Sequence, residues 1–555
     1  MKARLRGLID RALADARAAG ELASTETPEY VVEVPREEGH GDLATNVAMM
    51  LAKPERKSPR AIADIVARHL ARAELVDRAE SAGPGFLNVT FADAAWRTRL
   101  LEILSAGDEF GQTGGGRGKR IQVEFCSANP TGPLHIGHGR GAATGDGIAR
   151  LLEATGYDVE REYYINDAGV QMERIGRSVF YRYLELLGRR SPDDFPEDCY
   201  PGDYVTIYAQ EIIDVDGERW AGLPEPEVVA YFGKRAGDAM LEKIREDLAI
   251  FGVEFDNFTS ERELAESSRV LDAIEELRSR GHVYDEGGAT WMRTTAFADD
   301  KDRPVIKSDG SLTYFASDIC YHREKMKKGF DRLIDVWGAD HHGYISRTRA
   351  SLQALGYDAD RLRVVLVQMV SLSRDGQPVR MGKRSGEFIT LRDVLDEVGP
   401  DLARFFFLSR RSDAHLDFDL ELARRQTAEN PVFYVQYAHT RIAGIFRQVA
   451  EKDLAVPDAS DESVAALGHP DEIAMVKLLA EFPEIVAGAA EALEPHRVIF
   501  YAQKVAGEFH RFYSKHRFVS EDAATTGARL LLARAVGQVL GRALRLVGIA
   551  APERM

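Results

Sequence analysis

The chain has 555 residues, 45% of them hydrophobic and 29% charged, which is typical of folded globular domains and excludes a disordered chain. No apolar run of about 18 residues is present, so a membrane-spanning helix is excluded. The net charge of −17 argues against a uniformly basic surface. The three cysteines, Cys126, Cys199 and Cys320, are too widely spaced for a disulfide framework or a CxxC zinc site.

The same observations bear on the cellular compartment. The first 20 residues carry charges throughout their apolar stretch, so they lack the apolar core of a secretory signal and predict an amphipathic helix. Widely spaced cysteines suit a reducing environment. We therefore expect a cytoplasmic protein.

Residues 1–106 are predicted to form a small α+β domain. After the amphipathic helix, residues 30–34 predict a strand, residues 41–52 a helix and residues 86–91 a second strand. The glycine-rich segment GQTGGGRGKR that follows predicts a linker.

Residues 107–424 predict an α/β domain with a Rossmann-type parallel sheet. A strand, a helix and a strand are expected at 120–125, 141–154 and 158–165, and again at 333–337, 344–355 and 363–370. A mostly helical insertion at about 171–303, with a loop at 191–204, separates these two halves. A site is expected at the carboxyl ends of the strands.

Residues 425–555 show only helical periodicity and predict a helix bundle. The helices are expected at 432–451, 471–493, 496–516 and 527–547. The segment from His496 to Gly548 contains nine basic and three acidic residues, with aromatic residues and histidines interleaved. This pattern suits phosphate attraction with base stacking, or simply a solvated bundle face over core aromatics.

Residues 133–141, PLHIGHGRG, form the first candidate phosphate site. Glycines allow close approach of the backbone to a phosphate, and a following helix directs its positive end toward an anion. His135 and His138 can both donate hydrogen bonds from the first helical turn. The alternative is a structural turn with solvated histidines.

Residues 379–386, VRMGKRSG, form a second candidate phosphate site. Its cations could stabilise charge on a transferring phosphate. By itself such a run is equally a solvated surface, and its pairing with the first glycine loop favours the phosphate function.

The run Gly338-Ala339-Asp340-His341-His342 has two interpretations. It could contact the ribose and adenine of ATP at the end of a parallel strand. It could also bind a metal, as in phosphoesterases with an Asp-His-His run. Adjacent residues point in different directions and no further ligands are found, so we expect no metal site.

The two glycine loops together resemble those of class I aminoacyl-tRNA synthetases. Residues 135–138 match the HIGH motif, while residues 380–384 match KMSKS loosely, keeping Met381 and Lys383. Other segments resemble arginyl-tRNA synthetases, and they cover nearly the whole chain: GHGDLATN at 39–46, EFCSANP at 124–130, YYINDAG at 163–169, GADHHGY at 338–344 and APERM at 551–555.

The resemblance implies arginine activation by ATP and transfer of the arginyl group to the terminal adenosine of tRNA(Arg). It implies that Glu124, Tyr314 and Asp318 hold the guanidinium, while Ser127 and Asn129 orient the α-amino end; polar contacts from His135 and His341 complete the set. Carboxylates suit a guanidinium because they accept its forked hydrogen bonds, and an aromatic ring suits its face.

For the nucleotide, the expected catalytic groups are His135, His138 and Lys383, which stabilise charge on the phosphates. The expected ATP-binding residues are His135, Gly137, His138, Asp340, Met381, Lys383 and Arg384. Magnesium is expected with ATP as the substrate complex, no protein-bound zinc is expected, and adenylate formation is expected to require tRNA.

For tRNA, the resemblance implies that residues 1–106 contact the D-loop through Phe86 and Asn88. It implies that the bundle binds the anticodon, with these candidates: Tyr434, Tyr437, Arg441 and Met555. A monomer is expected.

Three rivals remain open. A class I synthetase for another amino acid is one, although a cysteinyl enzyme would require zinc-ligating cysteines. A non-catalytic tRNA-binding paralogue should have lost Lys383 or the HIGH motif, and a nucleotidylyltransferase would leave the bundle unexplained.

Overall fold

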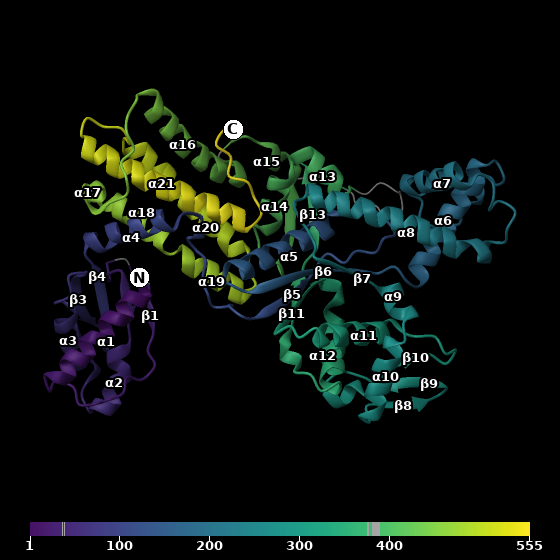
Figure 1. The fold of residues 1–555 in the computed structure, drawn as a ribbon, viewed down its shortest axis with the longest axis horizontal. Helices are drawn as coiled ribbons and strands as arrows, with labels where there is room; N and C mark the ends of the chain where they lie inside the picture. The colour runs from purple at the N-terminus through teal and green to yellow at the C-terminus, as the bar shows by residue number, and fades with distance from the viewer. Residues whose placement is uncertain (36, 38, 375–376, 380–388, 428) are drawn as a thin grey trace.

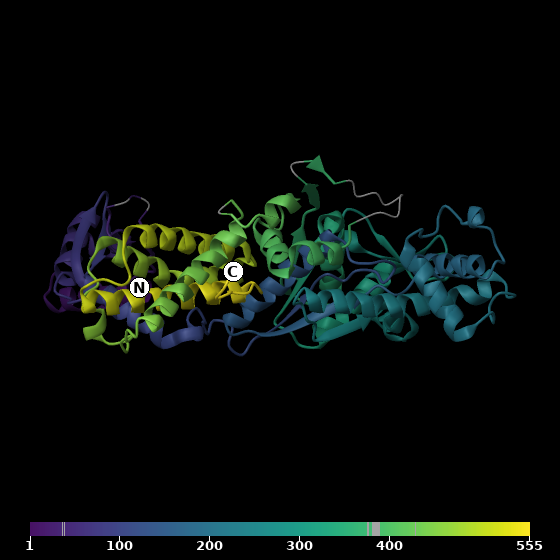
Figure 2. The same cartoon turned by 90° about the horizontal axis from the view of Figure 1, so that it is seen from above.

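The computed structural model describes residues 1–555 except residues 36, 38, 375–376, 380–388 and 428. The molecule is elongated, with the N-terminal domain at one end and a helical arm at the other, as Figures 1 and 2 show. A parallel sheet and a helical bundle lie between them. Among the described residues, no helix is both long enough and apolar enough to cross a membrane.

The N-terminal domain is an antiparallel sheet packed against helices, as predicted for an α+β domain. Its strands lie in the order β1-β2-β4-β3. Its elements are α1 (Lys2–Ala18), β1 (Val32–Glu33), β2 (Leu43–Thr45), α2 (Val47–Glu55), α3 (Pro59–Leu70), β3 (Val76–Ala82) and β4 (Phe86–Phe91).

Helix α3 and strand β3 were not predicted, and one predicted helix of this domain begins later than expected. The helix expected over residues 41–52 begins only at Val47, because Leu43–Thr45 pairs with β4 as strand β2. All three residues of β2 are buried, and the Thr45 hydroxyl accepts a hydrogen bond from the Val47 amide at 3.2 Å. Residues 43–45, which helical periodicity assigned to the first turn of the helix, therefore form a strand because they pair with β4.

Helix α4 (Asp93–Ala106) joins the N-terminal domain to the bundle. It packs on bundle helices α18 (Pro470–Ala480) and α21 (Ala523–Leu546). Arg97 donates to the Leu467 carbonyl at 2.9 Å, and Lys477 lies 2.5 Å from the Asp42 carboxylate. The short helix η1 (Gly107–Glu109) and a turn-rich segment then lead into the sheet.

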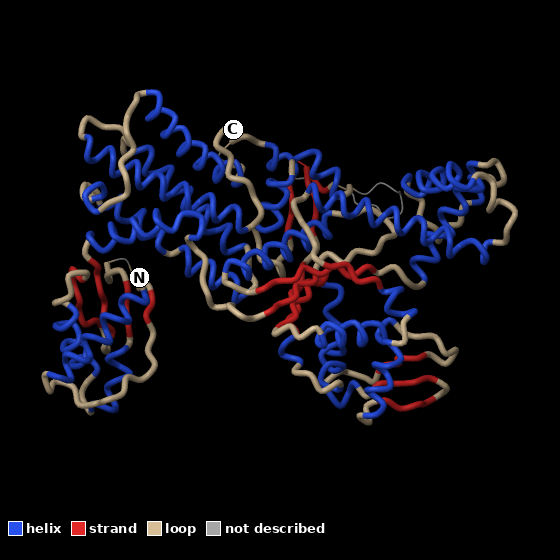
Figure 3. The backbone as a smooth tube through the Cα atoms, viewed as in Figure 1, coloured by secondary structure: helices blue, strands red, loops and turns tan. Residues whose placement is uncertain are grey.

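The central sheet is parallel and has the order β12-β11-β5-β6-β7, seen edge-on in the middle of Figure 3. Its strands are β5 (Arg120–Glu124), β6 (Asp158–Ile165), β7 (Asn257–Ser260), β11 (Arg332–Gly338) and β12 (Leu362–Val367). Helix α5 (Ile136–Ala154) packs closely on β5: a Cβ added to Gly145 would lie 2.1 Å from the Phe125 ring. The Rossmann-type core is thus confirmed.

Two boundaries of the sheet differ from the prediction. Strand β7 lies within the segment expected to be an insertion, yet it pairs with β6 as an edge strand. The strand expected over 363–370 is divided, because β12 ends at Val367 and Val370 begins β13 (Val370–Arg374) in another sheet. Neither pairing is visible in the local hydrophobic pattern.

The rest of the expected insertion has two parts. The first is the helical arm, formed by α6 (Val170–Leu186), η2 (Pro192–Asp194), α7 (Asp203–Asp216) and α8 (Glu225–Ile250). The second is an antiparallel sheet beside short helices: α9 (Glu261–Glu266), α10 (Arg269–Ser279), β8 (Val283–Glu286), β9 (Ala289–Met292), η3 (Thr294–Phe297) and β10 (Arg303–Ile306). This second part shares a hydrophobic cluster with α11 (Tyr314–Lys327).

After β11 the chain forms η4 (Ala339–Tyr344), α12 (Ile345–Ala354) and η5 (Ala359–Arg361) before β12. A small sheet of order β14-β13-β15 follows. It comprises β13, β14 (Gln377–Pro378) and β15 (Leu416–Asp419), with helices α13 (Leu391–Val398), α14 (Pro400–Leu408) and α15 (Leu420–Arg424).

The C-terminal region is the predicted helix bundle. Its helices are α16 (Pro431–Glu451), α17 (Asp461–Val464), α18, α19 (Phe482–Ala492), α20 (His496–Lys515) and α21. The segment expected to form a single helix over 471–493 forms two helices, because the helix is interrupted at Glu481, just before Phe482-Pro483. Proline has no backbone N–H to donate to the preceding turn, as a continuous helix requires.

Candidate functional site

The HIGH motif forms the amino end of α5. His135 is the N-cap, and its Nδ1 accepts hydrogen bonds from the amides of Gly137 and His138 at 3.1 and 3.4 Å. The Nδ1 atom of His138 accepts from the His135 amide at 3.3 Å, and the two rings stack with centroids 3.7 Å apart. Because Nδ1 is an acceptor in both rings, each neutral ring carries its proton on Nε2, where it can be donated to a phosphate oxygen.

The HIGH segment is tied to the chain that follows the second phosphate loop. His135 forms a β-bridge with Thr390, and the Leu391 amide donates to the Leu134 carbonyl at 2.7 Å. The buried Arg140 of the same helix donates to the carbonyls of Gln368, Ala414 and Arg411 at 2.8–2.9 Å. The chain therefore leaves residues 380–388 beside the HIGH helix, whereas Met381, Lys383 and Arg384 themselves lie outside the described residues.

Glu124 ends β5 and lies in a buried charge network. Its Oε2 lies 2.8 Å from the ammonium of Lys325, and its Oε1 accepts a hydrogen bond from Ser127 Oγ at 3.1 Å. Lys325 also lies 2.7 Å from Asp335, which in turn contacts His322 Nε2 at 2.9 Å. Although burial opposes it, the two carboxylates raise the pKa of Lys325, so this lysine is charged.

Ser127 and Asn129 follow β5 in a tight turn. Cys126 and Ser127 have φ values of +68° and +37°, a conformation that non-glycine residues adopt only when the surroundings impose it. The Ser127 hydroxyl accepts from the Tyr164 amide at 3.1 Å, and Asn129 donates to Gln171. This turn places both predicted residues beside the end of β6.

Asp318 and Tyr314 lie one turn apart on α11, as expected from their spacing. Burial raises the pKa of Asp318 to about 6, with His322 opposing and Glu124 adding to the shift. Burial also raises the pKa of Tyr314, reinforced by the carboxylates of Glu261 and Asp318. Tyr314 is half exposed, so it lies on the solvent side of the carboxylates of Asp318 and Glu261.

Glu261 is a further acidic residue close to Asp318, and it is not among the residues predicted from the sequence. Burial, reinforced by Asp318 and Asp167, raises its pKa to about 7. Its Oε2 atom and the hydroxyl of Tyr164 are buried without a hydrogen-bond partner among the described residues. Asp167 positions this segment by accepting from Ser260 Oγ at 2.8 Å and from the Arg262 amide at 2.9 Å.

The sequence holds no local signal for Glu261. Asp167 belongs to the YYINDAG segment, and a buried carboxylate at a strand end must bind something. Its partners are Ser260, the last residue of β7, and Arg262 just after it, 93 and 95 residues later in the chain, and only the pairing of β6 with β7 brings them together. No local pattern points to that contact.

The GADHH run forms η4 at the end of β11, which is the edge expected for nucleotide contact. Asp340 and His341 are exposed, with His341 Nε2 3.7 Å from Asp340 Oδ2. His341 acts electrostatically on Asp318, which places this loop beside that carboxylate.

The predicted tRNA residues of the bundle form an aromatic cluster on α16 and α20. The Arg441 guanidinium lies over the rings of Tyr437 and Tyr513, at 4.4 and 5.1 Å from their centroids. His510 packs on Tyr434, with ring centroids 4.5 Å apart, and its Nδ1 accepts a hydrogen bond from the Arg441 guanidinium at 3.0 Å. The structure thus brings Tyr434, Tyr437 and Arg441 together.

The C-terminal tail runs along the same helix. The Pro552 carbonyl accepts from Thr440 at 3.1 Å, and the Glu553 carbonyl accepts from Arg447 at 2.9 Å. Met555 is exposed beyond these contacts. In the N-terminal domain, Phe86 and Asn88 lie half-buried on one face of β4, so neither is a core residue.

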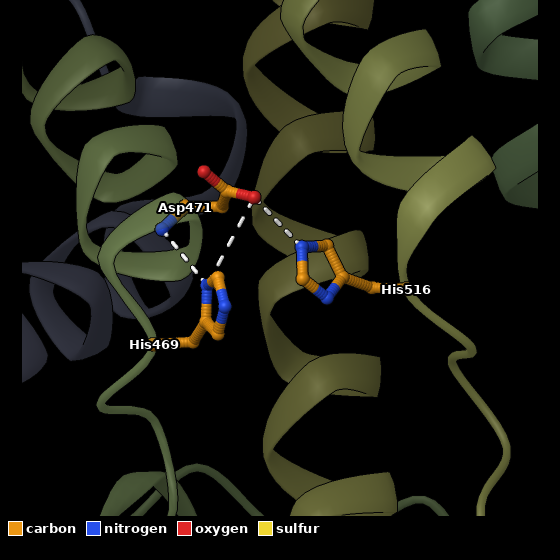
Figure 4. A group of neighbouring side chains, drawn as sticks. All are labelled: His469, Asp471 and His516. Atoms are coloured by element: carbon orange, nitrogen blue, oxygen red, sulfur yellow. Dashed lines mark hydrogen bonds and ion pairs between the residues drawn. The ribbon is translucent and has the colours of Figure 1, made fainter.

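One group of metal-ligand type occurs among the described residues, in the bundle (Figure 4). It comprises His469, Asp471 and His516. His469 caps α18 by accepting from the Asp471 amide at 3.1 Å, and Asp471 contacts His516 at 2.8 Å and Lys515 at 3.9 Å. These contacts are those of a capped helix end beside a lysine, which disfavours a bound cation.

A HIGH motif at the amino end of a helix on a parallel sheet, with Thr390 bridged to His135, defines a class I aminoacyl-tRNA synthetase. The fold agrees with that of a methionyl-tRNA synthetase from Mycobacterium tuberculosis, with a TM-score of 0.55 and 14% identity over 77% of this chain and 91% of that one. Three family models match the chain. They are the arginyl tRNA synthetase N terminal domain at 3–91, the class I (R) catalytic domain at 99–179 and 234–409, and the DALR anticodon binding domain at 435–555.

Full-length relatives agree with these models. The chain is 53% identical to the arginine–tRNA ligase of Citrifermentans bemidjiense and 51% identical to that of Syntrophotalea carbinolica, with 100% of each chain covered. A crystal structure from Campylobacter jejuni described as a putative arginyl-tRNA synthetase has a TM-score of 0.77 and 33% identity, covering 84% of this chain and 100% of that one. The chain belongs to the arginyl-tRNA synthetase family.

Proposed function

We propose that arginine binds in the acidic pocket between β5, α9 and α11, and that Asp318 and Glu261 hold its guanidinium. The reaction of this arginine–tRNA ligase forms arginyl-adenylate from ATP and then arginyl-tRNA, releasing pyrophosphate and AMP. The observation that carries the pocket assignment is that the buried Glu261 and the half-buried Asp318 have no ion pair within 4 Å among the described residues, while desolvation raises the pKa of both carboxyl groups. Two such groups favour a cationic ligand, because their charges repel each other and lack solvation.

The other predicted arginine contacts fit around this pair, with Glu124 reassigned from the guanidinium, where the resemblance placed it, to the α-amino end. Tyr314 lies on the solvent side, where its ring can cover the guanidinium, and His341 lies on the nucleotide side. Glu124, Ser127 and Asn129 form the wall at the end of β5, which we assign to the α-amino end. We assign His135 to the carboxylate of the bound arginine.

We assign the phosphates of magnesium-bound ATP to His135, Gly137, His138 and the loop carrying Met381, Lys383 and Arg384, and the ribose to Asp340. The Nε2 protons of the two histidines and the ammonium of Lys383 would stabilise charge on the α-phosphate as the arginine carboxylate attacks it. No protein side chain acts as a nucleophile. The absence of a bound zinc stays a prediction.

For tRNA, we propose that residues 1–106 contact the D-loop through Phe86 and Asn88. Residues 107–424 carry the chemistry, and residues 425–555 read the anticodon, supported by the cluster of aromatic rings and Arg441. The cytoplasmic location stays a prediction. The monomeric state is also a prediction, which sedimentation of the pure enzyme would test.

Two measurements test the proposed function. Each of the twenty amino acids is offered for charging onto total tRNA, and pyrophosphate exchange with arginine is followed with and without tRNA. We expect charging by arginine alone and exchange that depends on tRNA. Charging by another amino acid would contradict the assignment of the acidic pocket, and steady exchange without tRNA would contradict tRNA-dependent activation.

A further inference from the structure

The charge network behind the proposed arginine pocket contains one cation that no motif assigned, Lys325. Its side chain is 2% exposed, and its ammonium lies between Glu124, at 2.8 Å, and Asp335, at 2.7 Å. Both carboxylates are themselves buried. A buried lysine is costly unless it is paired, so this one must compensate charges that the site requires.

Lys325 also fixes the direction of the Glu124 carboxylate. With Oε2 on the ammonium, Oε1 faces Ser127 Oγ at 3.1 Å, and that hydroxyl also accepts from the Tyr164 amide. Ser127 has φ of +37°, so contacts around it must hold the turn. The chain Lys325–Glu124–Ser127 therefore links α11 to the turn after β5.

The network separates two kinds of carboxylate. Glu124 and Asp335 share the Lys325 cation, whereas Asp318 and Glu261 have no ion pair within 4 Å among the described residues. Glu124 nevertheless acts on Asp318 electrostatically. An uncompensated Glu124 would therefore add a third charge to a pocket meant for one guanidinium.

We propose that Lys325 is a positioning residue for arginine activation: its ammonium holds Glu124 against Ser127 and offsets part of its charge, so that Asp318 and Glu261 supply most of the charge that binds the guanidinium. This inference rests on the proposed arginine pocket. Lys325 acts through Glu124 and does not touch the substrate.

The inference predicts a pH signature, because the protonation of Asp318 depends on the charges around it. Those on α11 and β5 are Tyr314, Tyr321, His322, Lys325 and Glu124. Those on the other packed elements are Asp335, Tyr164, Asp167, Glu261, His341 and Arg347. Of these, only the Lys325–Glu124 pair is changed in the test.

The test uses the full-length enzyme with tRNA, ATP and variable arginine from pH 5.5 to 8.5. In Lys325→Met, we expect the KM for arginine to rise about tenfold while the KM for ATP stays within about twofold. The acid limb of kcat/KM for arginine should move up by about half a pH unit or more, because an added negative neighbour disfavours ionisation of Asp318.

The charge series gives a result that a merely structural lysine would not. Glu124→Gln should move the acid limb down, and Lys325→Met/Glu124→Gln should return it to the wild-type position, since that pair restores the net charge. Lys325→Arg should leave the limb in place. Lys327→Met is the matched control, because Lys327 is exposed on the same helix beside Glu324, and it should change nothing.

Three outcomes decide the matter. If Lys325→Met does not fold, Glu124→Gln is compared with the double variant, and identical acid limbs in those two overturn the inference. If Lys325→Met folds but loses kcat and affinity for both substrates equally, with an unmoved limb, Lys325 is only structural. An unchanged KM for arginine in Asp318→Asn overturns the proposed pocket itself, whereas a raised KM there with unmoved limbs in the series overturns this inference alone.

Discussion

Arginine should bind more weakly as the pH falls from 8 to 5.5, because the pocket must lose protons to receive the guanidinium. Without arginine, burial holds the pKa of Asp318 at about 6 and that of Glu261 at about 7, both above the usual carboxyl range. Both groups are therefore largely protonated at pH 5.5 and largely ionised at pH 8. Arginine itself keeps its charges over this interval, so the dependence belongs to the protein.

The magnitude follows from the two pKa values. If arginine binds only the form with both carboxylates ionised, that form falls from about nine-tenths of the protein at pH 8 to below about one-hundredth at pH 5.5. The apparent association constant should then fall by about 100-fold. At 1.36 kcal/mol per tenfold, this is about 2.7 kcal/mol of binding free energy.

The assay is calorimetric titration of the full-length enzyme with arginine across this pH range. Near pH 6.5, binding should release about one proton per arginine, since Glu261 is then half or more protonated. Repeating the titration in buffers of different ionisation enthalpy measures that number. Release, rather than uptake, is the expected sign because a cationic ligand lowers the pKa of both groups.

Two variants locate the effect. Glu261→Gln should remove most of the pH dependence between pH 6 and 8. Asp318→Asn should remove a change of about twofold between pH 6 and 5.5 and leave the change of about threefold that is due to Glu261. An association constant that varies by less than about threefold over the whole range would refute the reasoning, as would an unchanged pH profile in both variants.

The remaining predictions concern the phosphate loop, the tRNA surface and the core. Lys383→Ala should lower the rate of adenylate formation far more than the affinity for arginine, measured by tRNA-dependent pyrophosphate exchange; a change confined to arginine affinity would contradict its phosphate role. Arg441→Ala should weaken tRNA binding and lower the slope of log K against log salt by about one unit; an unchanged slope would remove Arg441 from the phosphate contacts. Arg404→Met should cost about 3 kcal/mol of stability and lower the thermal midpoint, because the buried guanidinium pairs with Asp146 and bonds the Val547 carbonyl; an unchanged midpoint would contradict this.

Much of the fold could be predicted because many helices and strands show the hydrophobic periodicity of their type in their own sequence. Strand β6 and helices α5, α16, α20 and α21 lie close to the positions that alternation or helical periodicity predicts. The failures share a cause. Strand β2 and strand β7 are short and are defined by their partners in a sheet, β4 and β6, rather than by a pattern of their own.

The candidate site divides in the same way. The HIGH segment was visible because its glycines and histidines are consecutive and form one helix end. Glu261 and Lys325 were missed, because each acquires a role only from residues that lie far away in the sequence. A lysine on α11 is ordinary until its ammonium is found between two buried carboxylates.

The sequence by itself determined the α/β core, the bundle, the two glycine loops and the resemblance to arginyl-tRNA synthetases, because those signals are local in the chain. Only the tertiary structure decided which carboxylates are paired and which remain to bind a cation. That distinction depends on burial and on distances of a few ångströms between α9, α11 and β5, and the free energy of a buried charge is set by those neighbours rather than by residue type.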